Sequence, residues 1–277
     1  MVISDKQVYA ATRFIEEANR QNIGLKVLCV EDLIAKNFDV DVFQYQALYV
    51  RNPYVKGRAG YLPQIINLAK KFKAAGKKVV DTTIAEGNLG QGKWADYRAL
   101  MRAGLPIPKT RMLSDCSLTT VHCPLILKWT YGFKGKHTYF VKNELEFHLL
   151  AKKYSKDELL LQEFVNAEYE YKVITVGYKA LPVVLRFAIN PKTHRPDFKQ
   201  IQIINVGNGL DRSLQRIIDI SQRASELLGR ELAKVDILEA KGQFYILEVN
   251  RFPGLQSFEK FTKHNVARAF LDYLHSQ

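Results

Sequence analysis

The chain has 277 residues, with 47% hydrophobic and 25% charged residues, which is the composition of an ordinary globular protein of one large or two modest domains. No apolar run approaches the ~20 residues that a membrane-spanning helix needs, and residues 1–5 do not have the pattern of a signal peptide. The three cysteines match no zinc-ligand spacing and favour reduced thiols, so we expect a cytoplasmic protein.

The formal net charge of +13 is concentrated in two segments. Residues 51–80 hold eight Lys or Arg and no acid, and a second basic segment follows Glu170. The basic residues of the second segment are Lys172, Lys179, Arg186, Lys192 and Arg195. Such fields attract anions, although a merely solvated surface has the same composition.

Helical and strand patterns alternate in the first part of the chain. Apolar spacing predicts helices over 8–20 and 62–75, and short apolar runs predict strands over 25–30, 47–50 and 78–80. This alternation indicates a parallel sheet with right-handed crossovers. The glycine-rich stretch 86–92 breaks the pattern, so we place a domain boundary there, between residues 1–90 and 91–277.

The second domain mixes strands and helices in a different order. We expect helices over 94–102, 144–153, 214–228 and 266–274. Strands are expected over 125–129, 138–141 and 159–165, two more within 171–189, and a hairpin that closes the domain. The fold class is therefore α/β (α+β).

The hairpin near the C-terminus carries a metal-site pattern. Residues 234–250 form two apolar runs separated by a Lys-Gly turn at 241–242, and antiparallel pairing would bring Asp236 beside the Glu248 end of the partner strand. Glu248 and Asn250 leave the same face of their strand. Hard oxygen ligands of this kind suit Mg²⁺ shared with nucleotide phosphates. A polar-faced surface hairpin explains one of the acids, but not three converging oxygen donors.

Weaker signals precede the hairpin. Lys128 ends an apolar strand, and the following loop contains Gly132 and Gly135, whose backbone N–H groups can approach phosphate oxygens. The strand that ends at Glu163 can present its backbone to the edge of a base. A plain hairpin and an edge strand would look the same.

The order and spacing of these segments resemble the ATP-grasp superfamily, and most closely its RimK-like branch, the ribosomal-protein glutamate ligases and their relatives. The resemblance covers roughly residues 93–274, and its most specific pieces are 159–165, 235–238 and 247–255. It implies a pre-ATP-grasp N-terminal domain and a two-subdomain ATP-grasp domain, divided at about 93–165 and 166–277. The nucleotide would lie between two sheets.

The resemblance also implies roles for individual residues. The residues expected to bind phosphate are Lys93, Lys128, Gly132 and Gly135. The adenine hinge would consist of Glu163, Phe164 and Val165, and Glu170 would contact the ribose. The ligands of Mg²⁺ or Mn²⁺ would be Asp236, Glu248 and Asn250, and Arg186 would lie near the phosphate and acyl groups.

Three positions depart from the family pattern. His137 stands where the phosphate loop usually has a third glycine, and Lys172 stands where an arginine is usual, without the planar fork of a guanidinium. Lys199 replaces an arginine of the acceptor region, whose further residues are not recognisable. The ATP and metal sites therefore look intact, while the acceptor side has changed.

The resemblance implies an ATP- and Mg-dependent carboxylate–amine ligase that forms an amide or peptide bond through an acyl phosphate. Catalytic roles would fall to Arg186 and Lys172. We expect an anionic carboxylate substrate and an amine, whether small molecule, peptide or protein tail; no membrane is expected, and a homo-oligomer stays open. Two alternatives remain at this point: an ATP-grasp small-molecule kinase, and a non-catalytic basic protein associated with nucleic acid.

Overall fold

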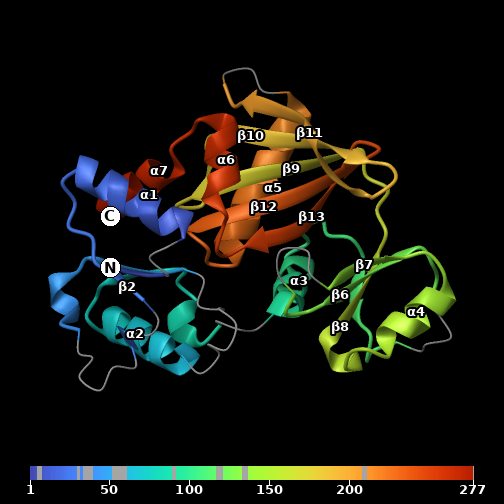
Figure 1. The fold of residues 1–277 in the computed structure, drawn as a ribbon, viewed down its shortest axis with the longest axis horizontal. Helices are drawn as coiled ribbons and strands as arrows, with labels where there is room; N and C mark the ends of the chain where they lie inside the picture. Colours follow the sequence, from blue (N-terminus) through green and yellow to red (C-terminus); the bar gives the residue numbers. More distant parts are fainter. Residues whose placement is uncertain are drawn as a thin grey trace.

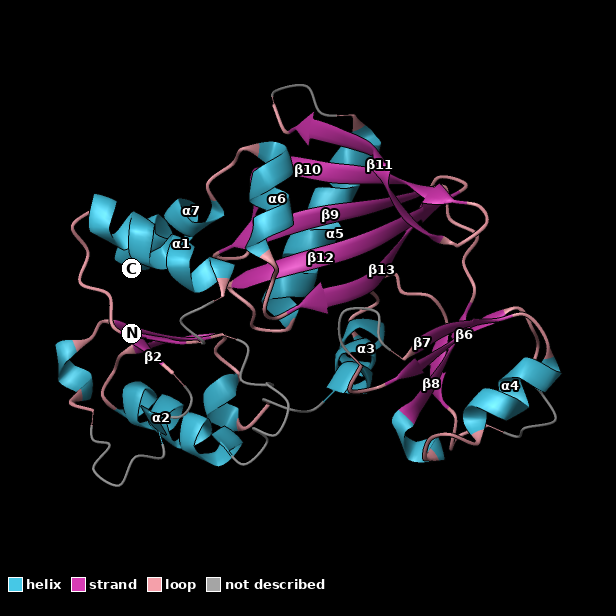
Figure 2. Cartoon of the chain, viewed as in Figure 1, coloured by secondary structure: helices cyan, strands magenta, loops and turns pink. Residues whose placement is uncertain are grey.

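The computed structural model of the chain describes residues 1–4, 8–29, 32–33, 40–51, 61–88, 92–116, 121–132, 137–207 and 211–276. Three sheets organise these residues, each beside its own helices (Figures 1 and 2). The sheet nearest the N-terminus is parallel, and the other two are antiparallel. The mixed α/β class expected from the sequence is confirmed.

The N-terminal sheet has the order β2-β1-β3-β4, with β1 (Val2–Ile3), β2 (Val27–Leu28), β3 (Ala47–Val50) and β4 (Lys78–Val80). All of its pairings are parallel, as predicted, although the two-residue β1 is too short to have been recognised. Helix α1 (Tyr9–Arg20) covers one face through Phe14, and α2 (Leu62–Ala74) covers the other through Ile65. One short 3₁₀ turn, Val42–Gln44, lies between β2 and β3, and another, Ile84–Glu86, comes after β4.

The four-stranded antiparallel sheet has the order β5-β8-β6-β7. Its elements are α3 (Gly92–Arg102), β5 (Thr110–Met112), β6 (Leu125–Trp129), β7 (Thr138–Val141), α4 (Glu144–Ala151), a 3₁₀ turn at Lys156–Glu158 and β8 (Leu159–Glu163). Phe147 of α4 packs with Leu127 and Leu161 on one face of this sheet. Side chains alternate along a strand, so Lys128 lies on the face that α4 leaves uncovered.

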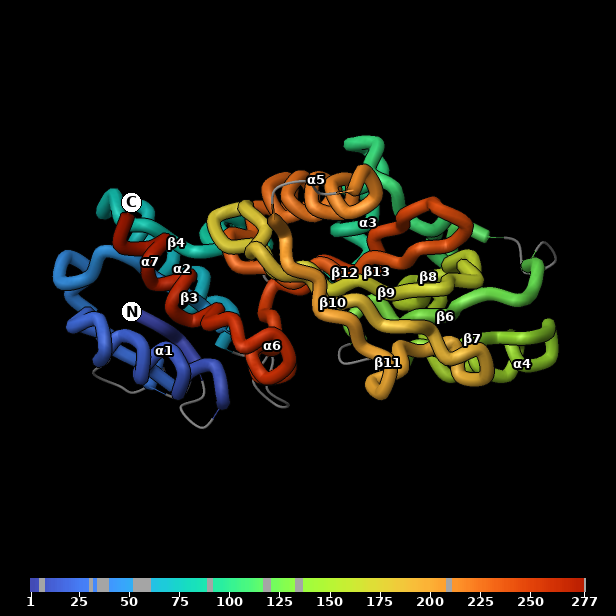
Figure 3. Tube along the Cα trace, turned by 90° about the horizontal axis from the view of Figure 1, so that it is seen from above, coloured from blue at the N-terminus to red at the C-terminus, as the bar shows by residue number. Residues whose placement is uncertain are grey.

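The five-stranded antiparallel sheet has the order β11-β10-β9-β12-β13. Its strands are β9 (Tyr169–Val176), β10 (Lys179–Asn190), β11 (Arg195–Asn205), β12 (Leu232–Ala240) and β13 (Gln243–Asn250). Helix α5 (Arg212–Leu227) covers one face (Figure 3). On this face Ile217 packs with Val173 and Val235. The opposite face carries the even-numbered residues of β9 and β12.

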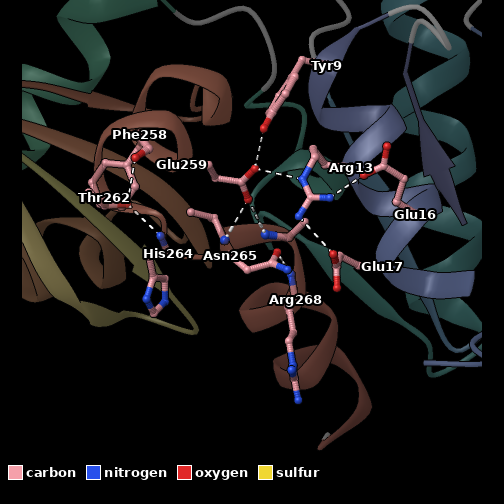
Figure 4. A network of polar contacts seen from close by, with 12 residues as sticks. Tyr9, Arg13, Glu16, Glu17, Phe258, Glu259, Thr262, His264, Asn265 and Arg268 are labelled. Atoms are coloured by element: carbon pink, nitrogen blue, oxygen red, sulfur yellow. Dashed lines mark hydrogen bonds and ion pairs between the residues drawn. The ribbon is translucent and has the colours of Figure 1, made fainter. Parts of the chain in front are cut away.

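The C-terminal helices α6 (Leu255–Thr262) and α7 (Val266–His275) return to the N-terminal part of the chain and pack on α1. Glu259 lies at the centre of this contact (Figure 4): its carboxylate accepts hydrogen bonds from the Tyr9 hydroxyl and Arg13 Nε at 2.8 and 3.0 Å. The N–H groups of Val266 and Ala267 donate to the same carboxylate. One buried acid therefore joins the two ends of the chain. The domain division at residue 90 stays a prediction.

No helix in the described ranges is long and apolar enough to cross a membrane.

Candidate active site

A β-bulge aligns the predicted metal ligands. Near the two-residue turn, Ala240 pairs with Gln243 and Ile237 with Ile246, but the next pair is Asp236 with Glu248. Leu247 is thus the extra, unpaired residue. Without this bulge Glu248 would lie opposite Val235, on the α5 side of the sheet. The bulge re-aims it, so that Asp236, Glu248 and Asn250 share the face opposite α5.

Lysines and acids alternate on this face. Asp236 of β12 lies between Lys172 of β9 and Glu248 of β13 in register. Lys172 Nζ forms an ion pair with Glu170 and lies 3.6 Å from Asp236 Oδ1. Burial works against the charge of Lys172, but the two carboxylates outweigh it and hold its pKa above the ordinary value. Burial also raises the pKa of Glu170, against the effect of Lys172.

The donor set fits a hard divalent cation. Asn250 Nδ2 lies 3.1 Å from Asp236 Oδ2, so the amide and the carboxylate are adjacent. Asp236 is buried, and its Oδ1 has no hydrogen-bond partner among the described residues. The Lys172 ammonium lies 3.6 Å from this oxygen, an ion pair longer than a hydrogen bond, so a metal cation that binds it directly would compensate its burial better. Within the described ranges no three His, Cys, Asp or Glu side chains gather, so the set is two carboxylates and one amide. Such an all-oxygen set suits Mg²⁺.

The N-terminus of α3 is held against the end of β6. Lys93 N–H donates to the Thr130 carbonyl oxygen at 2.9 Å, and Gly92 has φ +71°, where an added Cβ would meet Thr130 Oγ1 at 2.8 Å. This docking directs the Lys93 side chain to Glu248, with which it forms an ion pair. Burial opposes the Lys93 charge, but Glu248 outweighs it and raises the pKa.

Lys128 is buried on the open face of β6. Its Nζ lies 3.1 Å from the Tyr97 hydroxyl, which donates to the carbonyl oxygen of the bulged Leu247 at 2.7 Å. Burial lowers the pKa of Lys128 to about 8, although the carboxylate of Glu248 partly opposes this. A buried ammonium without a carboxylate in contact is a favourable site for an anion.

The phosphate-loop glycines are partly described. Gly132 is buried, and its N–H donates to the Trp129 carbonyl oxygen at 3.0 Å. Gly135 lies outside the described residues. His137, at the other end of the loop, has φ +60°, a backbone conformation that a glycine would adopt without strain.

The predicted hinge follows directly from β8. Glu163 N–H donates to the Lys109 carbonyl oxygen, and the Val165 carbonyl accepts from Ala167 N–H, both at 2.9 Å. The Phe164 ring contacts Phe140 of β7 at 4.6 Å and His194, of the β10–β11 turn, at 4.8 Å between centroids. The hinge is therefore packed between both antiparallel sheets.

Arg186 does not join the cluster of charged residues on the face opposite α5, which consists of Glu170, Lys172, Asp236 and Glu248. It pairs in register with Tyr171, stacks 4.4 Å from the Tyr169 ring and bonds Gln202. Since Lys172 and Glu170 alternate with these tyrosines, Arg186 lies on the other face of the sheet. The cluster face carries Phe187 instead, whose ring centroid lies 5.4 Å from Lys172 Nζ. This corrects the expected position of Arg186. The two-residue turn at 177–178 already implied that even-numbered residues of β10 share a face with odd-numbered residues of β9.

Lys199 is also apart from the cluster. It is exposed on the edge strand β11, its N–H donates to Asp197, and no contact joins it to the cluster among the described residues. Its predicted part in nucleotide binding stays a prediction.

Two residues near the cluster were not singled out from the sequence. Tyr97 follows Lys93 by four positions, which places both on one side of α3. Lys234 precedes Asp236 by two positions, which places both on one face of β12. Spacing alone was a sufficient signal for each of them.

Comparison with known proteins agrees with this arrangement. Residues 90–274 match the model of the RimK-like ATP-grasp domain. A probable alpha-L-glutamate ligase of Haemophilus ducreyi is 23% identical, with 99% of this chain and 97% of that protein covered. Another from Rhodopirellula baltica is 24% identical over 97% of this chain and 68% of its own length.

Solved structures share the fold. The ATP-grasp ligase PsnB complexed with a minimal precursor superposes with a TM-score of 0.71 at 16% identity, covering 100% of this chain and 97% of that one. The D-alanine–D-alanine ligase of Bacillus anthracis gives a TM-score of 0.67 at 17% identity, covering 99% and 95%.

The two antiparallel sheets and the match to the family model place the chain in the ATP-grasp class of ligases. The chain belongs to the RimK-like ATP-grasp family. It is an ATP-dependent carboxylate–amine ligase that uses ATP and Mg²⁺.

Proposed function

We propose that the chain joins an anionic carboxylate substrate to an amine through an acyl-phosphate intermediate. The observation that carries this proposal is the shared face of β9, β12 and β13, where Asp236, Glu248 and Asn250 lie among lysines. The Oδ1 of Asp236 accepts no hydrogen bond among the described residues and has the Lys172 ammonium at 3.6 Å, which supports a metal cation at this face. Bound Mg²⁺ would offset the phosphate charge there.

The reaction needs two displacements. A carboxylate oxygen of the substrate attacks the γ-phosphorus of ATP, and the bond from that phosphorus to the ADP oxygen breaks. The amine nitrogen then attacks the acyl carbon, inorganic phosphate leaves with the electrons of the broken C–O bond, and the nitrogen loses a proton. Positioning and charge stabilisation suffice for both steps, so no side-chain nucleophile is required.

Three lysines, Lys93, Lys128 and Lys172, would bind the phosphates. Lys93 and Lys128 approach from α3 and β6, and Lys172 from β9, so positive charge meets the triphosphate from both sheets. Lys93 is ion-paired with Glu248 and Lys172 with Glu170, and each lysine would exchange its carboxylate for phosphate oxygens. Lys128 has no such partner among the described residues, so its buried charge gains most from an incoming anion.

The nucleotide base would bind at the hinge. The hinge, residues 163–165, lies between the two antiparallel sheets, where the packing of Phe164 against Phe140 and His194 holds it in place. Glu170 would bind the ribose.

The substrate is proposed to be an acidic amino acid, an acidic peptide tail or a polycarboxylate. Exposed cations lie on β10, β11 and the turn between them: Lys179, Lys192, Arg195 and Lys199. The relatives are named probable alpha-L-glutamate ligases, and PsnB was solved with a precursor peptide. All three substrate classes would be attracted by this charge.

Hydroxylamine trapping tests the proposal. The protein is incubated with ATP, Mg²⁺, hydroxylamine and, in turn, L-glutamate, a peptide ending in glutamate, or citrate, and hydroxamate and ADP are measured. One acid should give both products in equal amounts, and Asp236→Asn should give neither. Release of ADP with a phosphorylated hydroxyl product and no hydroxamate would instead identify a kinase.

A further inference from the structure

Lys234 lies on the cluster face of β12, beside the predicted metal ligands. Its Nζ is 3.2 Å from Asp236 Oδ2, and it pairs in register with Asn250 of β13. The side chain is 21% exposed, so the ammonium is neither buried in the core nor free in solvent. A lysine at this place adds a positive charge to a site that is already flanked by Lys93 and Lys172.

The cluster and its neighbours on this face lie in three successive rungs of the sheet, where a rung is one row of paired residues across β9, β12 and β13. Glu170 pairs with Leu238 in the first rung, Lys172 with Asp236 and Glu248 in the second, and Ile174 with Lys234 and Asn250 in the third. Neighbouring rungs are about 6.5 Å apart, at ~3.3 Å rise per residue. The rung of Lys234, which also carries Asn250, is thus on the far side of Asp236 and Glu248 from the proposed ribose contact.

A nucleotide laid along these rungs points its terminal phosphate toward Lys234. Phosphoryl transfer requires the attacking oxygen to approach in line, from the side opposite the leaving ADP. The acceptor must therefore lie beyond the second rung, where the third rung offers the ammonium of Lys234. The neighbouring Ile174 is buried and apolar, so it supplies no competing charge.

We propose that Lys234 binds the oxyanion on the acceptor side, namely the substrate carboxylate and then the phosphoryl group that it receives. This inference rests on the proposed function of the cluster. Asp236 is the one carboxylate in ion-pair contact with Lys234 within the described part of the chain, and it is shared with Lys172 and Asn250. A cation on Asp236 would free Lys234 to turn to the substrate.

A simpler role for Lys234 is to balance the charge of Asp236 before Mg²⁺ binds. In that case removing the Lys234 charge would alter thermal stability or Mg²⁺ affinity, and would leave anion binding beyond the metal unchanged. The two roles are separable because inorganic phosphate, a product of the reaction, can be bound to the protein already loaded with Mg²⁺ and ADP.

The test is calorimetric titration of inorganic phosphate into that loaded protein. Lys234→Met, which keeps the length of the side chain, should weaken phosphate binding by about 10-fold or more, as expected for loss of one charge-assisted hydrogen bond. Lys234→Arg should recover much of the affinity. The matched control is Lys241→Met, in the turn of the same hairpin, which should bind phosphate like the parental protein.

Binding of Mg²⁺ and ADP, measured first, shows that each variant is folded and should change by less than about threefold. Parental phosphate affinity in Lys234→Met, or no saturable phosphate binding by the parental complex, would overturn the assignment of Lys234. Failure of the parental protein to bind Mg²⁺ and ADP would instead reject the proposed function of the whole cluster.

Discussion

The ammonium of Lys128 donates a hydrogen bond to the hydroxyl oxygen of Tyr97 at 3.1 Å, and that hydroxyl donates to the Leu247 carbonyl oxygen at 2.7 Å. Two bonds therefore connect β6 of one antiparallel sheet, helix α3 and the bulge of β13 in the other sheet. Burial raises the pKa of the Tyr97 hydroxyl, so it stays protonated and can donate to the bulge. The lysine predicted to bind phosphate and the bulge that aligns the predicted metal ligands are thus held by one side chain.

The buried charge of Lys128 should make stability depend on pH. Its pKa is about 8 in the folded protein against 10.5 for the ordinary lysine, so the unfolded chain binds more protons between these values. The free energy of unfolding should then rise with pH from about 8 to 10.5. Relative to Lys128→Met, the parental protein should gain roughly 2 kcal/mol between pH 7 and 9.5, at 1.36 kcal/mol per pKa unit. Urea unfolding of both proteins measures this, and parallel pH profiles would contradict it.

Glu248→Gln should abolish turnover and leave the fold intact. The change removes one predicted anionic oxygen ligand and the ion pair with Lys93. The Glu248 side chain is 36% exposed and the Lys93 side chain is 19% exposed. An ion pair of this exposure contributes at most about 1 kcal/mol to stability. The rate of ADP release should fall by about 100-fold or more, with a melting temperature near that of the parental protein. Glu226→Gln, at an exposed position of α5, is the control. Parental turnover in Glu248→Gln would remove Glu248 from the site.

ATP should bind at least about 30-fold more tightly than GTP. The proposed hinge at Glu163 to Val165 would offer backbone groups to the donor and acceptor atoms of adenine, and guanine would leave buried polar groups unpaired. Calorimetry with both nucleotides and Mg²⁺ gives the ratio directly. Equal affinities would show that these residues do not read the base.

Glu259→Ala should destabilise the protein by about 3 kcal/mol. The buried carboxylate accepts four hydrogen bonds, two from the α7 backbone and two from Tyr9 and Arg13, and its removal leaves Arg13 without this partner (Figure 4). The free energy of unfolding in urea should drop by this amount. Glu16→Ala, on the exposed side of α1, should change it by less than about 0.5 kcal/mol. A similar effect of both substitutions would show that Glu259 does not join the chain ends energetically.

The rate constant for the carboxylate substrate should fall with ionic strength. The Debye length shrinks from ~10 Å at 0.1 M to ~3 Å at 1 M, so attraction between exposed cations and an anionic substrate is lost. Lys192→Glu, in the exposed β10–β11 turn, should raise the KM of the substrate several-fold with little change in ATP affinity. Lys152→Glu, at the end of α4 on the reverse face of the small sheet, is the control. A KM that neither salt nor Lys192→Glu changes would mean that the charges serve only solubility.

Local sequence patterns were sufficient for much of this molecule. Strands β2 to β4, the α-helices other than α6, and the hairpin of β12 and β13 follow from apolar spacing and from turn residues such as Gly242, because each of these patterns is local in the sequence. The same patterns did not indicate β1, β5, β11 or α6. The same locality placed Asp236, Glu248 and Asn250 in one hairpin. It also implied, through the two-residue turn at 177–178, that Arg186 and Lys172 lie on opposite faces.

The tertiary structure decided that the predicted metal ligands Asp236, Glu248 and Asn250 share one face. From the two-residue turn alone, Asp236 would pair with Leu247, and Glu248 would point toward α5. The bulge at Leu247 reverses this, and its carbonyl oxygen is held by Tyr97, which is 150 positions away in the sequence. A one-residue bulge costs local pairing and is kept where distant contacts stabilise it. Those contacts come from α3 packing beside β13, a long-range relationship that no local pattern in the sequence contains.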